Sequence, residues 1–366
     1  MPRESIVVVG AGIIGASIAY HLAKRGAKVM VIEASQPAAG ASGKSFGWIN
    51  ATFSKRPRHY FDFNVQAIAD WHRLQQELDG EPTVHWGGSV AWCPPGVESI
   101  DLQRSVLGHQ QWGYAARFVD DSELHRLLPA VSPGEFDAAC YCADEGAVDP
   151  VDTLSVLLRK AKKLGAEMLC PLEVTGLDLS GGGLRGVHTS EGLVQAGALV
   201  LACGVQIPPI AKLAGVRVPL KDSPGVLIHT TPLPKLIDRV VLAPGVHFKQ
   251  CADGRIVAGG QVVAGAGTAS MHAGELQAEE IFEKARRFLP VLAGASLDHT
   301  TLGYRVMPED EYPILGFSAQ CANLYIAATH SGVALAPLIG RLAAMEILDG
   351  AQVSLLEPYR PSRFDL

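Results

Sequence analysis

Two short runs of apolar, mostly β-branched residues near the N-terminus predict two buried strands that are joined by a glycine turn and a helix. Ile6–Val9 and Val29–Ile32 are apolar at every position, which is typical of strands buried on both faces of a parallel sheet. A helix is expected over residues 16–24, and Gly26 fits its C-terminal stop. The pattern therefore predicts a βαβ unit at the start of the chain.

Predicted helices and predicted buried strands alternate along the rest of the chain. Apolar residues at 63, 67, 71, 74 and 78 form one helical stripe. A second stripe over 151–164 follows Asp149, which fits an N-cap, and Pro150, which fits the first helical position. Further buried strands are expected over 198–204 and 324–328, and the latter leads through a Gly332 turn into a helix.

The regions between these units predict a second, smaller domain. Residues 83–142 are interpreted as short strands and turns, and 224–305 as strands with one helix near 275–288. The order predicts an α/β fold in which a Rossmann-type dinucleotide-binding domain is interleaved with a β-rich α+β substrate-binding domain. The predicted boundaries are 1–80, 143–223 and 320–366 for the first domain, and 81–142 and 224–319 for the second.

Composition and charge narrow the class of protein. The chain has 366 residues, 48% hydrophobic and 19% charged, which suits a globular protein of two domains. The net charge of −6 argues against a nucleic-acid partner, because phosphate binding needs a surplus of Lys and Arg. The most apolar late stretch is interrupted by His330, Pro337 and Arg341, so no transmembrane segment is expected.

The seven cysteines include no CxxC pattern and no cluster at zinc-ligand spacing. We therefore expect no metal site and a cytoplasmic location, where thiols stay reduced. The oligomeric state stays open, a homo-oligomer included, because an exposed apolar patch cannot be identified from the sequence.

The candidate chemistry begins with the sequence GAGIIG at residues 10–15. Gly10 permits the tight turn, Gly12 lets the backbone approach a pyrophosphate, and Gly15 lets the helix pack on the strand. Glu33 ends the second strand, where a carboxylate can accept hydrogen bonds from ribose hydroxyls. The loop predicts a dinucleotide site, but by itself it does not separate NAD from FAD.

The whole chain resembles the D-amino-acid oxidase family of flavoproteins, which includes glycine oxidase and sarcosine oxidase. The resemblance rests on an ordered set of segments that begins with the glycine loop. The others are GASGKS at 40–45, GAVDP at 146–150, the strand that ends in ACG at 202–204, and THSGVA at 329–334.

This resemblance implies an FAD-dependent oxidoreductase. Its FAD is expected to be non-covalent, because Gly303 stands where sarcosine oxidases attach flavin through a cysteine. The small-residue loop would line the pyrophosphate and ribityl chain, and the Gly332 loop would face the flavin pyrimidine edge, although a plain strand-to-helix turn is the alternative for that loop. The implied cofactor-binding residues are Gly10, Gly12, Ile13, Ile14, Gly15, Glu33, Ala34, Ala41, Ser42, Lys44, Ser45, Phe46, Val174, Ala202, Gly204, Arg305, Ser331, Gly332, Val333 and Ala334.

Arg305 is the residue that the resemblance implies for substrate binding. A guanidinium binds both oxygens of a carboxylate in one plane and stays charged when buried. The alternative is a structural ion pair with Glu309 or Asp310.

Other residues are candidates for the substrate pocket. His247 falls where related enzymes place an aromatic or polar side chain over the flavin, and it could orient the substrate or hold its amine partly deprotonated. A satisfied interior histidine is the plainer interpretation. Tyr304 and Trp48 are pocket-lining candidates or core residues. Lys249 is a candidate for a residue at the flavin face, although an exposed strand lysine is the commoner case and is expected here.

The resulting hypothesis is an enzyme that oxidises the C–N bond of a small amine or amino acid (a D-amino acid, glycine or an N-alkyl glycine). Hydride transfer to flavin N5 would give an imine that water hydrolyses to an oxo acid. Oxygen or another acceptor would take the electrons, and the oxygen-activating lysine of sarcosine oxidases has no counterpart, with Val257 nearest. The alternatives are an FAD-dependent 2-hydroxy-acid oxidase or dehydrogenase, a nicotinamide dehydrogenase, and a non-catalytic FAD-binding interaction protein.

Overall fold

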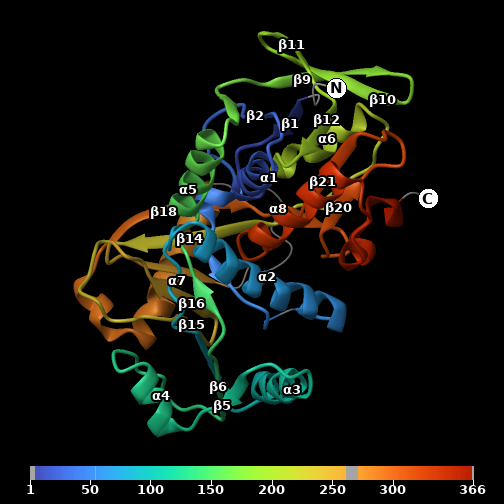
Figure 1. Cartoon of the computed structure of the whole chain (residues 1–366). Coiled ribbons are helices and arrows are strands. Elements are labelled where there is room, and N and C mark those ends of the chain that lie inside the picture. The colour runs from blue at the N-terminus through green and yellow to red at the C-terminus, as the bar shows by residue number, and fades with distance from the viewer. Residues whose placement is uncertain (1–4, 54, 261–270, 365–366) are drawn as a thin grey trace.

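Two β-sheets, one above the other in Figure 1, form the frame of the protein. The computed structural model describes residues 5–53, 55–260 and 271–364. The upper sheet has the order β20-β21-β12-β1-β2-β8 and is parallel except at its edge strand β20. Its strands are β1 (Ile6–Val9), β2 (Val29–Ile32), β8 (Glu167–Leu169), β12 (Ala198–Leu201), β20 (Ile314–Phe317) and β21 (Leu324–Ala328).

Both faces of the upper sheet are covered, which explains its continuous apolar strands. The helices α1, α5 and α8 pack on one face, and the antiparallel sheet β11-β10-β9 and helix α6 cover the other. Along β1, Val8 packs toward the first layer and Val7 and Val9 toward the second. These elements are α1 (Ile13–Lys24), α5 (Pro150–Lys163), α6 (Ile207–Lys212), α8 (Gly332–Asp349), β9 (Val174–Ser180), β10 (Gly183–Thr189) and β11 (Gly192–Gln195).

The lower sheet has the order β18-β14-β17-β16-β15-β4-β6-β5 and carries helix α7 (Met271–Phe288) on one face. Ala278, Ile281 and Ala285 of α7 are buried in one cluster with Ile228 and Phe248 of the sheet. Its strands are β4 (Ser89–Cys93), β5 (Ala116–Phe118), β6 (Ala138–Cys142), β14 (Pro224–Thr230), β15 (Val240–Ala243), β16 (Val246–Gln250), β17 (Ile256–Gly260) and β18 (Leu297–Tyr304).

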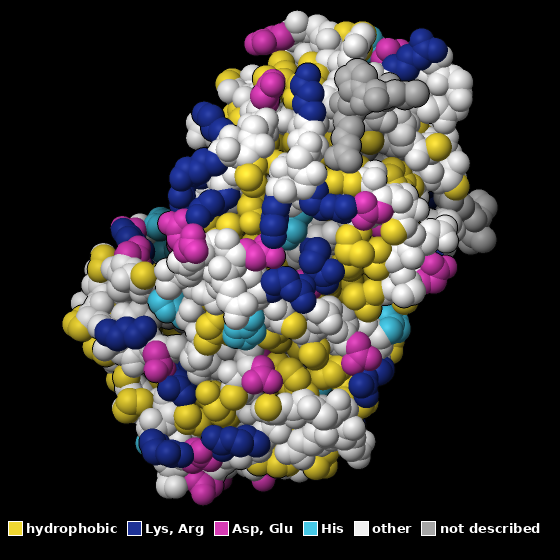
Figure 2. Space-filling model, in the orientation of Figure 1, with side chains coloured by type: hydrophobic (Ala, Val, Ile, Leu, Met, Phe, Trp, Pro, Cys, Tyr) yellow, Lys and Arg dark blue, Asp and Glu magenta, His cyan; other side chains and the backbone are white. Residues whose placement is uncertain are grey.

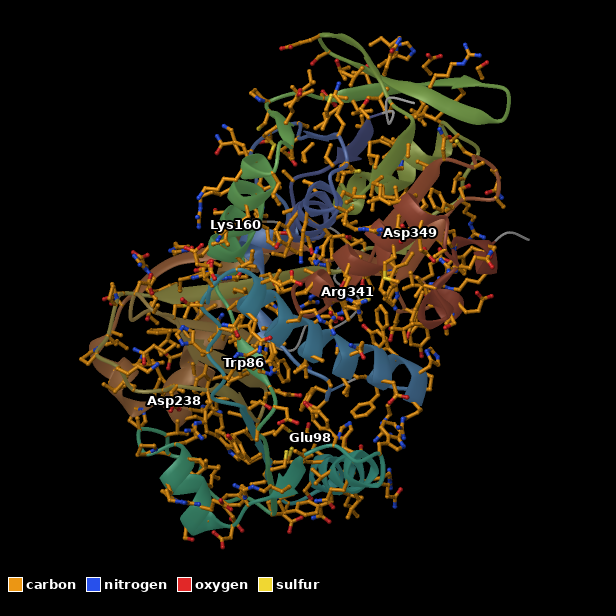
Figure 3. The ribbon with its side chains drawn as sticks, viewed as in Figure 1. Trp86, Glu98, Lys160, Asp238, Arg341 and Asp349 are labelled. Atoms are coloured by element: carbon orange, nitrogen blue, oxygen red, sulfur yellow. The ribbon has the colours of Figure 1, made fainter. Side chains whose placement is uncertain are left out.

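Helix α2 (Arg58–Glu77) lies between the two halves and binds both. The side chain of Asp70 is 2% exposed and accepts two hydrogen bonds, at 2.9 and 2.8 Å, from Arg341 of α8, whose position is labelled in Figure 3. About one and a half turns further along the helix, Gln75 Oε1 accepts from Nε1 of Trp86, which precedes β4, at 2.7 Å. The helix therefore fixes the lower sheet against the helical layer of the upper one.

The predicted fold class is confirmed, and one local prediction is wrong. Both N-terminal strands have the predicted bounds, and Asp149 caps α5 by accepting from the backbone N–H groups of Val151 and Asp152. The region 83–142, however, also contains the helices α3 (Val97–Gln111) and α4 (Asp121–Leu127), at the bottom of Figure 1. Only Ser99, Val106 and His109 of α3 are buried, so this helix carries no broad apolar stripe.

The domain boundaries remain a prediction. The strands of the two sheets interleave along the chain, and the edge strand β20 of the upper sheet lies before the predicted boundary at residue 320. Residues 1–4, 54, 261–270 and 365–366 of the predicted ranges lie outside the described residues.

The distribution of charged side chains and the hydropathy of the helices can be compared with the sequence. On the face drawn in Figure 2, Lys and Arg side chains are interspersed with Asp and Glu over both halves of the molecule. None of the helices in the described part of the chain is long and apolar enough to cross a membrane.

Candidate functional site

A cavity of about 1660 Å³ lies between the carboxyl ends of the upper strands and the open face of the lower sheet. Residues that follow β1, β2, β12 and β21 line one side of it, and Leu227, Leu242 and His247 of the lower sheet line the other. In open parallel sheets, ligands bind at the carboxyl ends of the strands. The cavity is therefore the place where this fold would hold a cofactor.

The glycine loop forms the upper end of this cavity. A Cβ atom on Gly10, whose φ is +106°, would lie 2.6 Å from the carbonyl oxygen of Ala202, and one on Gly15 would lie 1.9 Å from the oxygen of Gly10. Neither position accepts a side chain, so the loop stays tightly folded against the strand. Helix α1 begins after Gly12 with no acidic residue in its first turn, which leaves its positive end available to an anion.

Two polar side chains hold the loop in place. Glu33, after β2, accepts from the backbone N–H of Ala11 at 2.9 Å and from that of Ser35 at 3.0 Å. Ser42 accepts from the N–H of Ile13 at 2.9 Å. The carboxylate and the small-residue loop thus reach the first turn of α1, where a dinucleotide would place its ribose and phosphates.

Helix α8 closes the cavity at the other side. It begins at Gly332, directly after Ser331, whose φ of +59° turns the chain sharply out of β21. A Cβ on Gly332 would lie in ordinary contact with Ile13 and Ile14, so the starts of α8 and α1 lie close together. Both helix N-termini therefore belong to the same cavity.

Arg305 lies on the cavity wall without a carboxylate partner in the described part of the chain. Its Nη1 donates to the carbonyl oxygen of Pro224 at 3.3 Å and contacts Ser223 Oγ at 3.5 Å. Neither acid named for the alternative role binds it, because Asp310 pairs with Arg363 and Glu309 with Arg217. Burial lowers the pKa of Arg305, as expected for a desolvated cation without a counter-ion.

His247 lies on the same wall as a neutral imidazole. Its ring makes an edge contact with Phe46 at 4.7 Å between centroids, and a Cβ on Gly259 would lie 2.6 Å from its Nε2. Burial, and then the charge of Arg305, lower the pKa of His247 to about 4. Tyr304 lines the cavity with 40% of its surface exposed.

The structure brings together almost all the residues predicted for cofactor and substrate. Every predicted cofactor-binding residue except Gly15 lines the cavity, as do Arg305, His247, Tyr304 and Trp48. Gly15 lies behind the loop and fixes its shape. The glycine cradle, the two helix N-termini and the size of the cavity fit FAD, whose binding by these individual residues remains a prediction.

One prediction about a lysine is wrong. Lys249 is not an exposed strand lysine: it is 5% exposed, lies 5.5 Å from the Phe46 ring centroid and donates to the carbonyl oxygen of Val148 at 2.6 Å. Burial lowers its pKa. It shares a strand face with His247, and Phe46 covers that face.

Sequence reasoning missed two charged groups near the cavity. Lys55 lines the cavity, is 6% exposed and donates to Ser331 Oγ at 2.5 Å. Glu145 is fully buried behind the segment that carries Trp48. Neither belongs to a periodic pattern, and distant segments build both environments: Ser331 accepts from Lys55, and residues 48–52 donate to Glu145.

Comparisons with known proteins agree with this geometry. A family model described as FAD dependent oxidoreductase (DAO) matches residues 5–345. The chain is 26% identical to a glycine oxidase of Bacillus licheniformis over 99% of this chain and 98% of that protein. It is 25% identical to an iminodiacetate oxidase of Chelativorans sp. BNC1, with a TM-score of 0.83 over 97% of this chain and 98% of the other.

The fold is also that of an L-proline dehydrogenase from P. horikoshii, with a TM-score of 0.86, 24% identity and coverage of 100% and 99% of the two chains. The family resemblance seen in the sequence is therefore confirmed over nearly the whole chain. This protein belongs to the DAO family of FAD-dependent oxidoreductases.

Proposed function

We propose that the protein binds FAD non-covalently and uses it to oxidise the C–N bond of a small amine or amino acid. The observation that carries the proposal is Arg305, a cation on the cavity wall that no carboxylate of the described residues neutralises. A buried guanidinium without a counter-ion is costly, and a substrate carboxylate would supply the missing partner. The relatives named glycine oxidase and iminodiacetate oxidase support this substrate class.

The residues around the upper end of the cavity would hold FAD. The glycine loop and the start of α1 would bind the pyrophosphate, Glu33 the adenosine ribose, and the start of α8 the flavin pyrimidine edge. Non-covalent binding is supported by Gly303, which has no side chain, and by Cys203, whose thiol has a pKa raised to about 12 by burial. When bound, FAD supplies the acceptor for a hydride, that is, for two electrons and one proton.

The residues of the lower sheet would position the substrate. Arg305 would bind the carboxylate in a bidentate manner, and His247, neutral at pH 7, would accept a hydrogen bond from the amine. The positive charge of Arg305 and the low polarity around Phe46 both favour the neutral amine, whose lone pair is needed for hydride loss. Orientation in a shielded cavity then provides most of the rate, without a strong base.

The first test is an anaerobic visible spectrum of the FAD-loaded protein before and after each candidate substrate is added. D- and L-amino acids, N-alkyl glycines and 2-hydroxy acids form the panel. We expect the flavin bands to bleach with an amine or amino acid. Bleaching by 2-hydroxy acids alone would favour the alternative oxidase or dehydrogenase, and flavin that no compound bleaches would refute the proposal. Readmitted air then shows whether oxygen is the acceptor.

A matched pair of variants tests the role of Arg305. Arg305→Met is expected to lower kcat/KM for carboxylated amines by about 100-fold or more, because a buried charge pair loses one partner. Arg217→Met removes an arginine whose side chain is 63% exposed and is expected to have little effect. Normal oxidation of amino acids by an FAD-loaded Arg305→Met protein would contradict the assignment.

A further inference from the structure

A second cation faces the same cavity as Arg305. The ammonium of Lys55 donates to Ser331 Oγ at 2.5 Å and lies 5.2 Å from the centroid of the Tyr60 ring. Both partners are neutral, and within the described ranges no carboxylate pairs with Lys55. A lysine that is 6% exposed and has only neutral partners carries a charge that the protein itself does not balance.

Lys55 and Arg305 both line the cavity near His330. His330 lies next to Ser331, and its pKa falls to about 3 through burial and then through the positive charges of Lys55 and Arg305. Lys55, His330 and Arg305 all line the cavity, and Lys55 binds the residue next to His330. This wall has two positive charges and a neutral imidazole.

The acids that line the cavity do not offset these charges. Among the described lining residues they are Glu33, Glu173 and Glu311. Glu33 is bound to the backbone of the glycine loop, and Glu311 is bound to Lys221 at 2.6 Å. Glu173 directly precedes β9, next to Val174, which is among the residues proposed to bind the cofactor. The phosphates of a dinucleotide would lie at the glycine loop and not beside Tyr60 of α2.

We propose that Lys55 binds a second anionic group of the substrate, so that the preferred substrates are amines that carry two carboxylates. This inference rests on the proposed function. Arg305 takes the carboxylate next to the oxidised carbon, and Lys55 takes the one on the far side of the nitrogen or at the end of the side chain. A carboxylate replaces a hydroxyl and an aromatic ring as the partner of the ammonium, which makes the hydrogen bond charge-assisted on both sides. An alkyl group in that place would leave the buried ammonium with neutral partners only, Ser331 and Tyr60.

The test compares two achiral compounds that differ only in the second carboxylate, iminodiacetate and N-ethylglycine. The FAD-loaded protein and its Lys55→Met variant are assayed with both. We expect the variant to lower the ratio of kcat/KM for iminodiacetate over N-ethylglycine by about 30-fold or more, since one partner of a buried charge pair is truncated. Lys55→Arg should restore part of the ratio, and Lys163→Met, which removes an exposed lysine of α5, should not change it.

A binding measurement separates this inference from the proposed function. Thiodiacetate and ethylthioacetate (the thioether carboxylate with an ethyl group on sulfur) have nearly the shapes of iminodiacetate and N-ethylglycine, but they contain no amine that could be oxidised. Their binding is followed by the change that they cause in flavin absorption. Weaker binding of thiodiacetate, and not of ethylthioacetate, in the loaded Lys55→Met protein would support the inference even if no amine bleaches the flavin. Equal losses for both compounds, or a shifted flavin midpoint potential with an unchanged ratio, would overturn it.

Discussion

The buried carboxylate of Glu145 is expected to be one of the most sensitive polar positions of the protein. It is fully buried and accepts five hydrogen bonds, three at Oε1 and two at Oε2. The donors to Oε1 are the backbone N–H groups of Ala51 and Thr52, at 3.1 and 3.0 Å, and the Thr52 hydroxyl, at 2.6 Å. The donors to Oε2 are Trp48 Nε1, at 3.1 Å, and the Ser89 hydroxyl, at 2.6 Å.

Replacement of Glu145 by glutamine keeps the shape of the side chain but not all of its acceptors. With its oxygen at the Oε1 position, the new amide would place its NH₂ group against the indole N–H of Trp48, while Ser89 could rotate to accept. The Trp48 N–H and the amide N–H that faces it then both lack an acceptor. Each unsatisfied buried donor costs about 1–3 kcal/mol, and three bonds that lose their charge cost roughly 0.5–1 kcal/mol each. Burial raises the pKa of Glu145, which shows that the buried charge is itself unfavourable, so its removal offsets part of this loss of stability. A net loss of at least about 2 kcal/mol in the free energy of unfolding is expected for Glu145→Gln.

Equilibrium unfolding in urea at pH 7.5 and a fixed excess of FAD, followed by tryptophan fluorescence, measures this loss. Glu357→Gln is the matched control, because the Glu357 side chain is 79% exposed and its expected change lies within about 0.5 kcal/mol of zero. If Glu145→Gln were as stable as that control, the five hydrogen bonds would contribute no net stability, and the reasoning would be wrong.

Three further changes have defined outcomes. Gly15→Ala places a Cβ 1.9 Å from the Gly10 oxygen and should weaken FAD binding at least about tenfold, measured by quenching of flavin fluorescence. Asp149→Ala removes the N-cap of α5 and should lower the free energy of unfolding by about 1 kcal/mol in urea. Burial lowers the pKa of His21 to about 4, so the unfolded chain binds its proton first and stability should fall as the pH falls from 6.5 to about 4. His21→Gln should weaken that dependence in unfolding curves at pH 7 and pH 5, and an unchanged slope would contradict the assignment.

The sequence predicts the elements that bury a regular pattern of apolar residues or that begin with a recognisable cap. Every residue of Ile6–Val9 is buried, so the strand is apolar at every position and is predicted from the sequence. The start of α5 is predicted from Asp149, because an N-cap depends only on residues next to it in the sequence. Helix α3 was missed because most of its surface remains exposed, which leaves no apolar period. Lys55 and Glu145 were missed for another reason: their environment is built by distant segments, and no local pattern encodes it.

The GAVDP segment at 146–150 has a structural role that explains why it stands out in the sequence. Gly146 and Ala147 pair with the strand that carries Trp48, and a Cβ on Gly146 would lie 2.8 Å from the Trp86 ring. The carbonyl oxygen of Val148 accepts from Lys249 of the lower sheet, while the next residue caps a helix of the upper layer. One short segment therefore holds the cavity-lining loop, the lower sheet and α5 at once, so substitutions there should disturb substrate binding without contacting the substrate.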